Sequence, residues 1–209
     1  MQPGDKSWDG WRETAPPGFR FAVKAHQYIT HWKRLKDCEA SLERVIESAR
    51  RLGPHLGPLL FQMPPQFKRT EANAGRLESF LGLLPDRPKT AFEFRDKSWF
   101  VDETFDLLRC YNVAFCVFDS PKLKSPLMTT APFAYVRFHG SGAAHGGNYS
   151  DEALRRRAER LRDLAMGLSD VYVYFNNDAF GHAVNNALTL RRLLNKETPE
   201  AEIAAVSMA

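Results

Sequence analysis

Apolar and charged residues alternate at two places in the chain where strands are expected, residues 92–95 and 135–140. Successive side chains on a β-strand point to opposite faces, so the phenylalanines of the first segment should share one face and its charged residues the other. The polar face defined by this alternation carries Glu93, Arg95, Arg137 and His139. One face can therefore pack in a core while the other is available for chemistry.

Six short apolar runs predict β-strands, at residues 19–25, 57–63, 90–95, 113–119, 134–140 and 170–177. Helical periodicity separates them, at residues 32–52, 71–84, 102–111, 150–168 and 180–194, with a further short helix at residues 8–13 before the first strand. Strands that are apolar at most positions and that alternate with helices predict a parallel sheet covered by helices.

Two architectures satisfy this pattern. A doubly wound sheet usually carries a glycine-rich phosphate turn after its first strand, and no such turn follows residues 19–25. A TIM-type (β/α) barrel fits better, although a complete barrel needs eight strands and typically about 250 residues. We therefore predict an incomplete barrel, with about six parallel strands in sequence order.

Length and composition predict one domain spanning residues 1–209. Residues 195–209, after the last helical pattern, are expected to form a mobile tail. Of the 209 residues, 44% are hydrophobic, which is enough for one sizeable core. The formal net charge is +4, and the basic residues are spread along the helices. This balance permits an anionic ligand without requiring one.

The cysteines and the amino terminus predict a reducing, cytoplasmic location. Cys38, Cys110 and Cys116 lack the paired spacing of metal ligands, so we expect reduced thiols. The sequence shows no amino-terminal apolar segment with a basic flank and no long uncharged apolar stretch, which argues against secretion and membrane spanning.

Several motifs in a fixed order resemble those of one family. They are Pro16–Ala25, Tyr28–His31, Leu59–Pro65, Phe92–Arg95 with Ser98–Phe100, Tyr135–Gly140, and Tyr174–Asp178 with Gly181–Ala183. Together they resemble the DUF72 (YecE-like) family, from about Ser7 to Leu194. The resemblance implies a TIM-type barrel whose biochemical activity is not established.

The chain also departs from that family pattern. Members usually open with a strand bearing a Gly-Thr-Ser-Gly-Trp-like motif, a helix, and a second strand ending near an Asn-Ser-Thr-Phe-Tyr-like motif, and none of these occurs here. The chain is therefore expected to lack the amino-terminal part of the family pattern, either because its start is placed too late or because it is a truncated paralogue. The first visible strand would then lack a partner, and a homo-oligomer could form through the exposed edge.

The carboxyl ends of the strands should converge on one mouth, where barrel active sites lie. The candidate catalytic residues there are Glu93, Asp119 and His139, and the candidate substrate-binding residues are Lys24, Gln62, Arg95, Arg137, Asn176 and Asn177. The alternative is that Glu93 and the arginines form a buried ion network that only fills the barrel. Trp99, Phe100 and Phe118 could stack on a ligand, but core packing is the favoured role for all three.

Two classes of function follow from this mouth. The first is an enzyme, hydrolase or isomerase-like, that acts on a phosphorylated sugar-like or nucleic-acid substrate, with Glu93 or Asp119 as general base and His139 as acid. A divalent metal ion could bind Glu93, Asp119 and His139 but is not favoured, because the sequence has no spacing typical of metal ligands. The sequence does not indicate which cofactor, if any, the protein uses. The second is a non-catalytic nucleotide or nucleic-acid binding module, and an inactive truncated paralogue is a further alternative.

Overall fold

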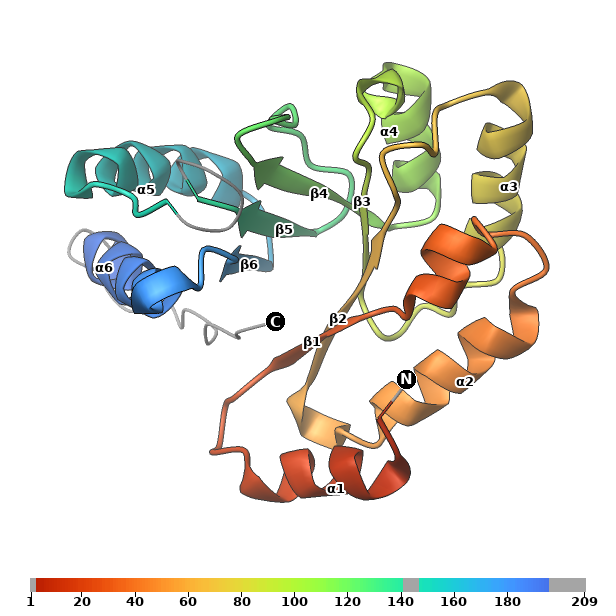
Figure 1. Ribbon diagram of the computed structural model, residues 1–209, viewed down its shortest axis with the longest axis horizontal. Helices are drawn as coiled ribbons and strands as arrows, with labels where there is room; N and C mark the ends of the chain where they lie inside the picture. Colours follow the sequence, from red (N-terminus) through yellow and green to blue (C-terminus); the bar gives the residue numbers. More distant parts are fainter. Residues whose placement is uncertain (1–2, 141–146, 196–209) are drawn as a thin grey trace.

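The structure is a computed structural model that describes residues 3–140 and 147–195. Its strands are β1 (Phe21–Lys24), β2 (Leu56–Gln62), β3 (Thr90–Glu93), β4 (Ala114–Asp119), β5 (Phe133–Phe138) and β6 (Asp170–Phe175). Its α-helices are α1 (Asp5–Thr14), α2 (Glu39–Arg50), α3 (Glu71–Leu81), α4 (Asp102–Cys110), α5 (Asp151–Ala165) and α6 (His182–Asn195), joined by the short helices η1 (Tyr28–Trp32), η2 (Gly53–His55), η3 (Lys97–Trp99) and η4 (Ala179–Gly181). Figure 1 shows the helices on the outside of a curled sheet.

The six strands form one parallel sheet in the order β1-β2-β3-β4-β5-β6. Each strand thus pairs with the next strand along the chain, and nowhere does the order reverse as a doubly wound sheet requires. The prediction of an incomplete TIM-type barrel is confirmed. Within the described residues, β1 and β6 are edge strands with one neighbour each.

The alternation of side chains divides the core between the two faces of the sheet. The helix-facing side holds a large apolar cluster that includes Phe61, Phe92, Phe94, Val136 and Phe138. A smaller cluster lies on the interior side of the curled sheet and contains Leu60, Ala91, Ala114, Cys116, Phe133, Tyr135, Tyr172 and Tyr174. The predicted separation of Phe92 and Phe94 from the charged residues between them is therefore correct.

Two connections differ from the sequence prediction. The helix predicted over residues 32–52 begins only at Glu39, because Arg34, Leu35 and Asp37 adopt positive φ angles of 50°, 66° and 47°, which no α-helix contains. The second is the connection from β4 to β5, where a barrel unit ordinarily has a helix; residues 120–132 form no helix here.

Other expectations concern the ends and the thiols. Of the predicted mobile tail at residues 195–209, Asn195 is the last residue of α6 and residues 196–209 lie outside the described residues, as do residues 141–146. The three cysteines are free. None of the helices in the described part of the chain has the length and apolar character needed to cross a bilayer.

Candidate functional site

Polar side chains from four strands meet at the carboxyl end of the sheet. Gln62 ends β2 and pairs in register with Glu93, which ends β3. Arg137 lies in β5, one residue before its end, and Asn176 directly follows β6. Because parallel strands in register present their last residues at the same level, these side chains reach one another across the interior of the curl.

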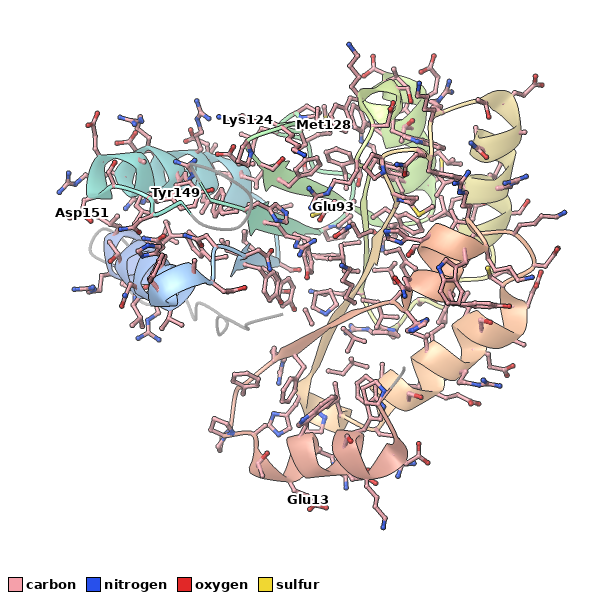
Figure 2. The ribbon with its side chains drawn as sticks, in the orientation of Figure 1. Glu13, Glu93, Lys124, Met128, Tyr149 and Asp151 are labelled. Atoms are coloured by element: carbon pink, nitrogen blue, oxygen red, sulfur yellow. The ribbon has the colours of Figure 1, made fainter. Side chains whose placement is uncertain are left out.

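Glu93 is the hub of this cluster. Its side chain is fully buried, and Figure 2 shows it near the centre of the molecule. Arg137 Nη1 donates to Glu93 Oε2 over 2.7 Å, and Arg95 Nε donates to Oε1. The thiol of Cys116 lies 3.5 Å from Oε2. A buried carboxylate held by two guanidinium groups is compensated for the solvation it has lost.

Arg137 is held rigidly by three acceptors. Besides Glu93, its Nε donates to Asn176 Oδ1 and its Nη1 to Gln62 Oε1, each over 3.0 Å. Its side chain is only 7% exposed. These contacts fix the plane of the guanidinium group, so that it is ordered before any ligand arrives.

Arg95 lies on the more open side of Glu93. Its Nη2 is 2.8 Å from His139 Nε2, and its guanidinium carbon is 4.8 Å from the centre of the Phe118 ring. Since a guanidinium group can only donate, Nε2 of His139 accepts in this arrangement and carries no proton. Arg95 is 19% exposed along its side chain, which leaves part of it open to solvent.

Lys24, at the end of β1, adds a third cation. Lys24 is an exposed residue, but partial desolvation of its amine and the positive charge of Arg137 lower its pKa, and Glu93 opposes this shift. Burial and the charge of Lys24 likewise lower the pKa of His31 in η1. Lys24, Arg95 and Arg137 thus face a single carboxylate, so the carboxyl end of the sheet carries an excess of positive charge.

We expect stability to fall in acid because of Glu93. Burial alone would raise its pKa, but the charges of Arg137 and Arg95 outweigh burial and lower the pKa below 4.5. A carboxylate with a depressed folded-state pKa contributes stability above its unfolded value, and this contribution is lost as the pH falls through the folded value. Urea unfolding followed from about pH 6 to pH 3 should show a steep decline below about pH 4.5. A flat profile there would contradict the ion network.

Two predicted site residues lie on the other side of the sheet. Asp119 is on the helix-facing side, where it pairs with Arg157 of α5 and with Lys124. Asn177 Nδ2 donates to Asn186 Oδ1 of α6 and to the Gly147 carbonyl, each over 2.9 Å. The expectation that Asp119 shares the interior with Glu93 is wrong, because a residue next to an interior-facing one, here Phe118, faces outward. Asn177, expected as a substrate-binding residue at the mouth, faces α6 for the same reason, since Asn176 before it faces the interior.

Two interior neighbours of the site were expected to have other roles. Phe118, for which core packing was favoured, lies under the Arg95 guanidinium group and edge-on to His139, and Cys116 lies against Glu93. Below them, the rings of Tyr135 and Tyr174 stack with centroids 4.8 Å apart. The alternation of side chains along β4 places Cys116 and Phe118 on the interior face and Asp119 on the other face. The prediction placed Asp119 in the interior instead, because its side chain is polar.

The residues described here offer no group of three or more His, Cys, Asp or Glu side chains that could hold a metal ion. The hypothetical metal set of Glu93, Asp119 and His139 fails because Asp119 is on the opposite face of the sheet. What the cluster can do chemically is bind an anion with its guanidinium and ammonium groups.

Comparison with known proteins supports a single family. The chain is 28% identical to the UPF0759 protein YunF of Bacillus subtilis (strain 168), over 94% of this chain and 80% of YunF. It superposes on a DUF72 family protein from Thermotoga maritima with a TM-score of 0.82 and 33% identity, covering 93% of this chain and 81% of that chain. A DUF72 family protein from Enterococcus faecalis, 21% identical, shares the fold with a TM-score of 0.83, over 99% of this chain and 85% of that chain. The model of the family described as "Protein of unknown function DUF72" matches residues 2–207, and the chain therefore belongs to this family.

Proposed function

We propose that this protein binds a phosphate-bearing ligand, sugar-like or nucleic-acid in kind, at the carboxyl-end mouth of its sheet. The observation that carries the proposal is the charge of the cluster, in which Lys24, Arg95 and Arg137 share one carboxylate, Glu93. Cations that outnumber their buried counter-ion attract an anion. The basic charge is here gathered at one place, although along the sequence it is dispersed.

The groups suit phosphate in particular. A guanidinium group can grip two phosphate oxygens at once, and Arg95 is the arginine of the cluster with more solvent exposure. Desolvation is the main cause of the lowered pKa of Lys24, and the positive charge of Arg137 adds to it, so part of the shift reflects repulsion between these two cations. A bound phosphate would relieve the repulsion between Lys24 and Arg137, and this relief contributes to binding.

The geometry supports binding more directly than it supports catalysis. Glu93 is ionised and already accepts hydrogen bonds from both arginines, which makes it a weak general base. Burial raises the pKa of the Cys116 thiol well above its ordinary value, which excludes it as a ready nucleophile. For the hydrolase or isomerase-like hypothesis, His139 is the one interior group that we assign to proton transfer, since it contacts Arg95 at the mouth.

The variant Arg95→Ala should weaken binding of inorganic phosphate and of ribose 5-phosphate. Loss of a charge-assisted contact is worth about 1.5–3 kcal/mol, which corresponds to a reduction in affinity of about ten- to a hundredfold. Isothermal titration calorimetry at low salt measures this change. Arg95→Lys keeps the charge but cannot bind two oxygens at once as a guanidinium group does, so its phosphate affinity should lie between those of Arg95→Ala and the unaltered protein.

Arg156→Ala is the matched control. Arg156 lies on α5 with a side chain 58% exposed, and it pairs with Glu152 of the same helix and not with Glu93, so its removal subtracts the same charge from the helix layer. Equal affinities of Arg95→Ala, Arg156→Ala and the unaltered protein would refute the proposal. So would the failure of the unaltered protein to bind either anion.

A further inference from the structure

Two aromatic side chains stand exposed on the short helix that follows β1. In η1, Trp32 is 67% exposed and Tyr28 is 37% exposed. Their ring centroids lie 5.9 Å apart with planes inclined at 78°. Because the rings meet nearly at right angles, Tyr28 can cover at most one face of the indole, and the other face stays accessible.

This aromatic pair lies at the rim of the mouth described above. The helix η1 starts four residues after Lys24, the last residue of β1, and therefore sits at the carboxyl end of the sheet. Lys24 connects the two places electrostatically, since its charge lowers the pKa of His31 in η1 while Arg137 lowers the pKa of Lys24 itself. The pair and the cationic cluster thus lie at the same end of the sheet.

The backbone holds the aromatic pair in an uncommon conformation. The helix η1 is a π-helix, in which the Lys33 N–H donates to the Tyr28 carbonyl over 2.8 Å. Arg34, Leu35 and Asp37 follow with positive φ angles, and buried Leu35 anchors this turn in the core. Left-handed non-glycine residues and single-turn π-helices both cost free energy, and both occur preferentially at functional sites.

Positive charge accompanies the aromatic rings. The Lys33 ammonium group lies 5.9 Å from the centre of the Tyr28 ring, and Arg34 and Lys36 follow on exposed positions. Asp37 is the one acidic residue of this turn. Exposed aromatic rings beside cations form the usual surface on which nucleobases stack.

Core packing does not account for Trp32. Trp99, which does serve the core, is 1% exposed, lies between the rings of Phe67 and Phe94, and donates its indole N–H to the Phe67 carbonyl. Trp32 has no such enclosure. A single exposed apolar residue needs no explanation, but an exposed aromatic pair on a strained segment at the rim of a cationic mouth does.

We infer that Trp32 and Tyr28 stack a nucleobase whose phosphate is held by the cluster of Lys24, Arg95 and Arg137. This inference rests on the proposed phosphate site and narrows its ligand from any phosphate ester to one that carries a base. A free nucleotide and the end of a single nucleic-acid strand share this chemistry.

The test compares ligands with and without a base. AMP and UMP should bind at least tenfold more tightly than ribose 5-phosphate. Trp32→Ala should lower the affinity for both nucleotides about tenfold and leave the affinity for ribose 5-phosphate unchanged. Trp32→Phe, which keeps a ring, should retain most of the affinity. Tyr111→Ala is the matched control, since Tyr111 is 39% exposed and follows α4 at the opposite end of the sheet.

The outcomes separate this inference from the function on which it rests. Equal binding of AMP and ribose 5-phosphate, with Trp32→Ala without effect on either, overturns the nucleobase platform and leaves the phosphate site intact. Absence of binding by all three ligands overturns both. An unchanged melting temperature of Trp32→Ala shows that lost affinity is not lost folding.

A further arm distinguishes the two sources of the base. A 5′-phosphorylated single-stranded decanucleotide that binds much more tightly than AMP, with affinity falling steeply as salt rises, supports the platform and identifies a strand as the ligand. Equal affinities of the decanucleotide and AMP support the platform with a free nucleotide as the ligand. A decanucleotide that binds equally well to Trp32→Ala and to the unaltered protein contradicts the platform.

Discussion

Glu93→Gln is expected to lower the free energy of unfolding by about 3–5 kcal/mol, the usual effect of removing one partner from a buried ion pair. Glutamine keeps the size of the side chain and can still accept a hydrogen bond. It leaves Arg95 and Arg137, however, without the buried negative charge that both now contact. Urea denaturation near neutral pH measures the loss.

Two companion variants make this expectation specific. Glu152→Gln breaks a pair with Arg156 whose side chains are 76% and 58% exposed, and should cost no more than about 0.5 kcal/mol. Adding Arg95→Gln to Glu93→Gln should recover part of the loss, because it removes one of the two uncompensated charges. If Glu93→Gln were no more destabilising than Glu152→Gln, the cluster would not be a buried ion network.

Trp99→Ala is expected to cost about 3–5 kcal/mol of stability, as large-to-small changes at a fully enclosed tryptophan do. Its indole stacks on Phe94 with centroids 4.7 Å apart and on Phe67 at 5.2 Å. The substitution would leave a cavity between these rings and would strip the buried Phe67 carbonyl of its donor. Thermal and urea unfolding both report this change.

Trp99→Phe provides the comparison within the same site. It retains a stacking ring but loses the hydrogen bond, so it should recover more than half of the effect of Trp99→Ala. Trp11→Ala, at a side chain 40% exposed on α1, should cost clearly less than Trp99→Ala. Similar losses for Trp11→Ala and Trp99→Ala would mean that burial of the indole does not determine stability here.

Strand order and the division of side chains between faces were both predictable from sequence. Side chains on a regular strand alternate between the two faces of the sheet. The alternation of apolar and charged residues around Glu93 and Arg137 therefore indicates which face each residue occupies. The helix-facing phenylalanines and the interior charges followed from this rule, and the motifs that resemble the family agreed with it. The role of Trp99 in core packing is likewise confirmed.

The errors arose at the ends of strands and in irregular backbone. Asp119 was assigned to the interior because polar residues at strand ends were assumed to face the mouth, although its neighbour Phe118 already occupies an interior position. Asn177 was expected to bind substrate beside Asn176, but its side chain bonds to Asn186 of α6. The exposed pair of Tyr28 and Trp32 was not predicted as a separate feature. Its position depends on a π-helix and on three left-handed residues, which leave no periodic signal in the sequence.

The sequence distances spanned by the polar cluster bear on how the chain folds. Each strand pairs only with the next strand along the chain, so the sheet can grow one unit at a time through short loop closures. The bond from Arg137 to Gln62, by contrast, joins residues 75 positions apart, and the bond to Glu93 joins residues 44 apart. Closing such long loops is entropically unfavourable until the intervening units are in place. The cluster should therefore form late, after the transition state, and its substitutions should speed unfolding more than they slow folding.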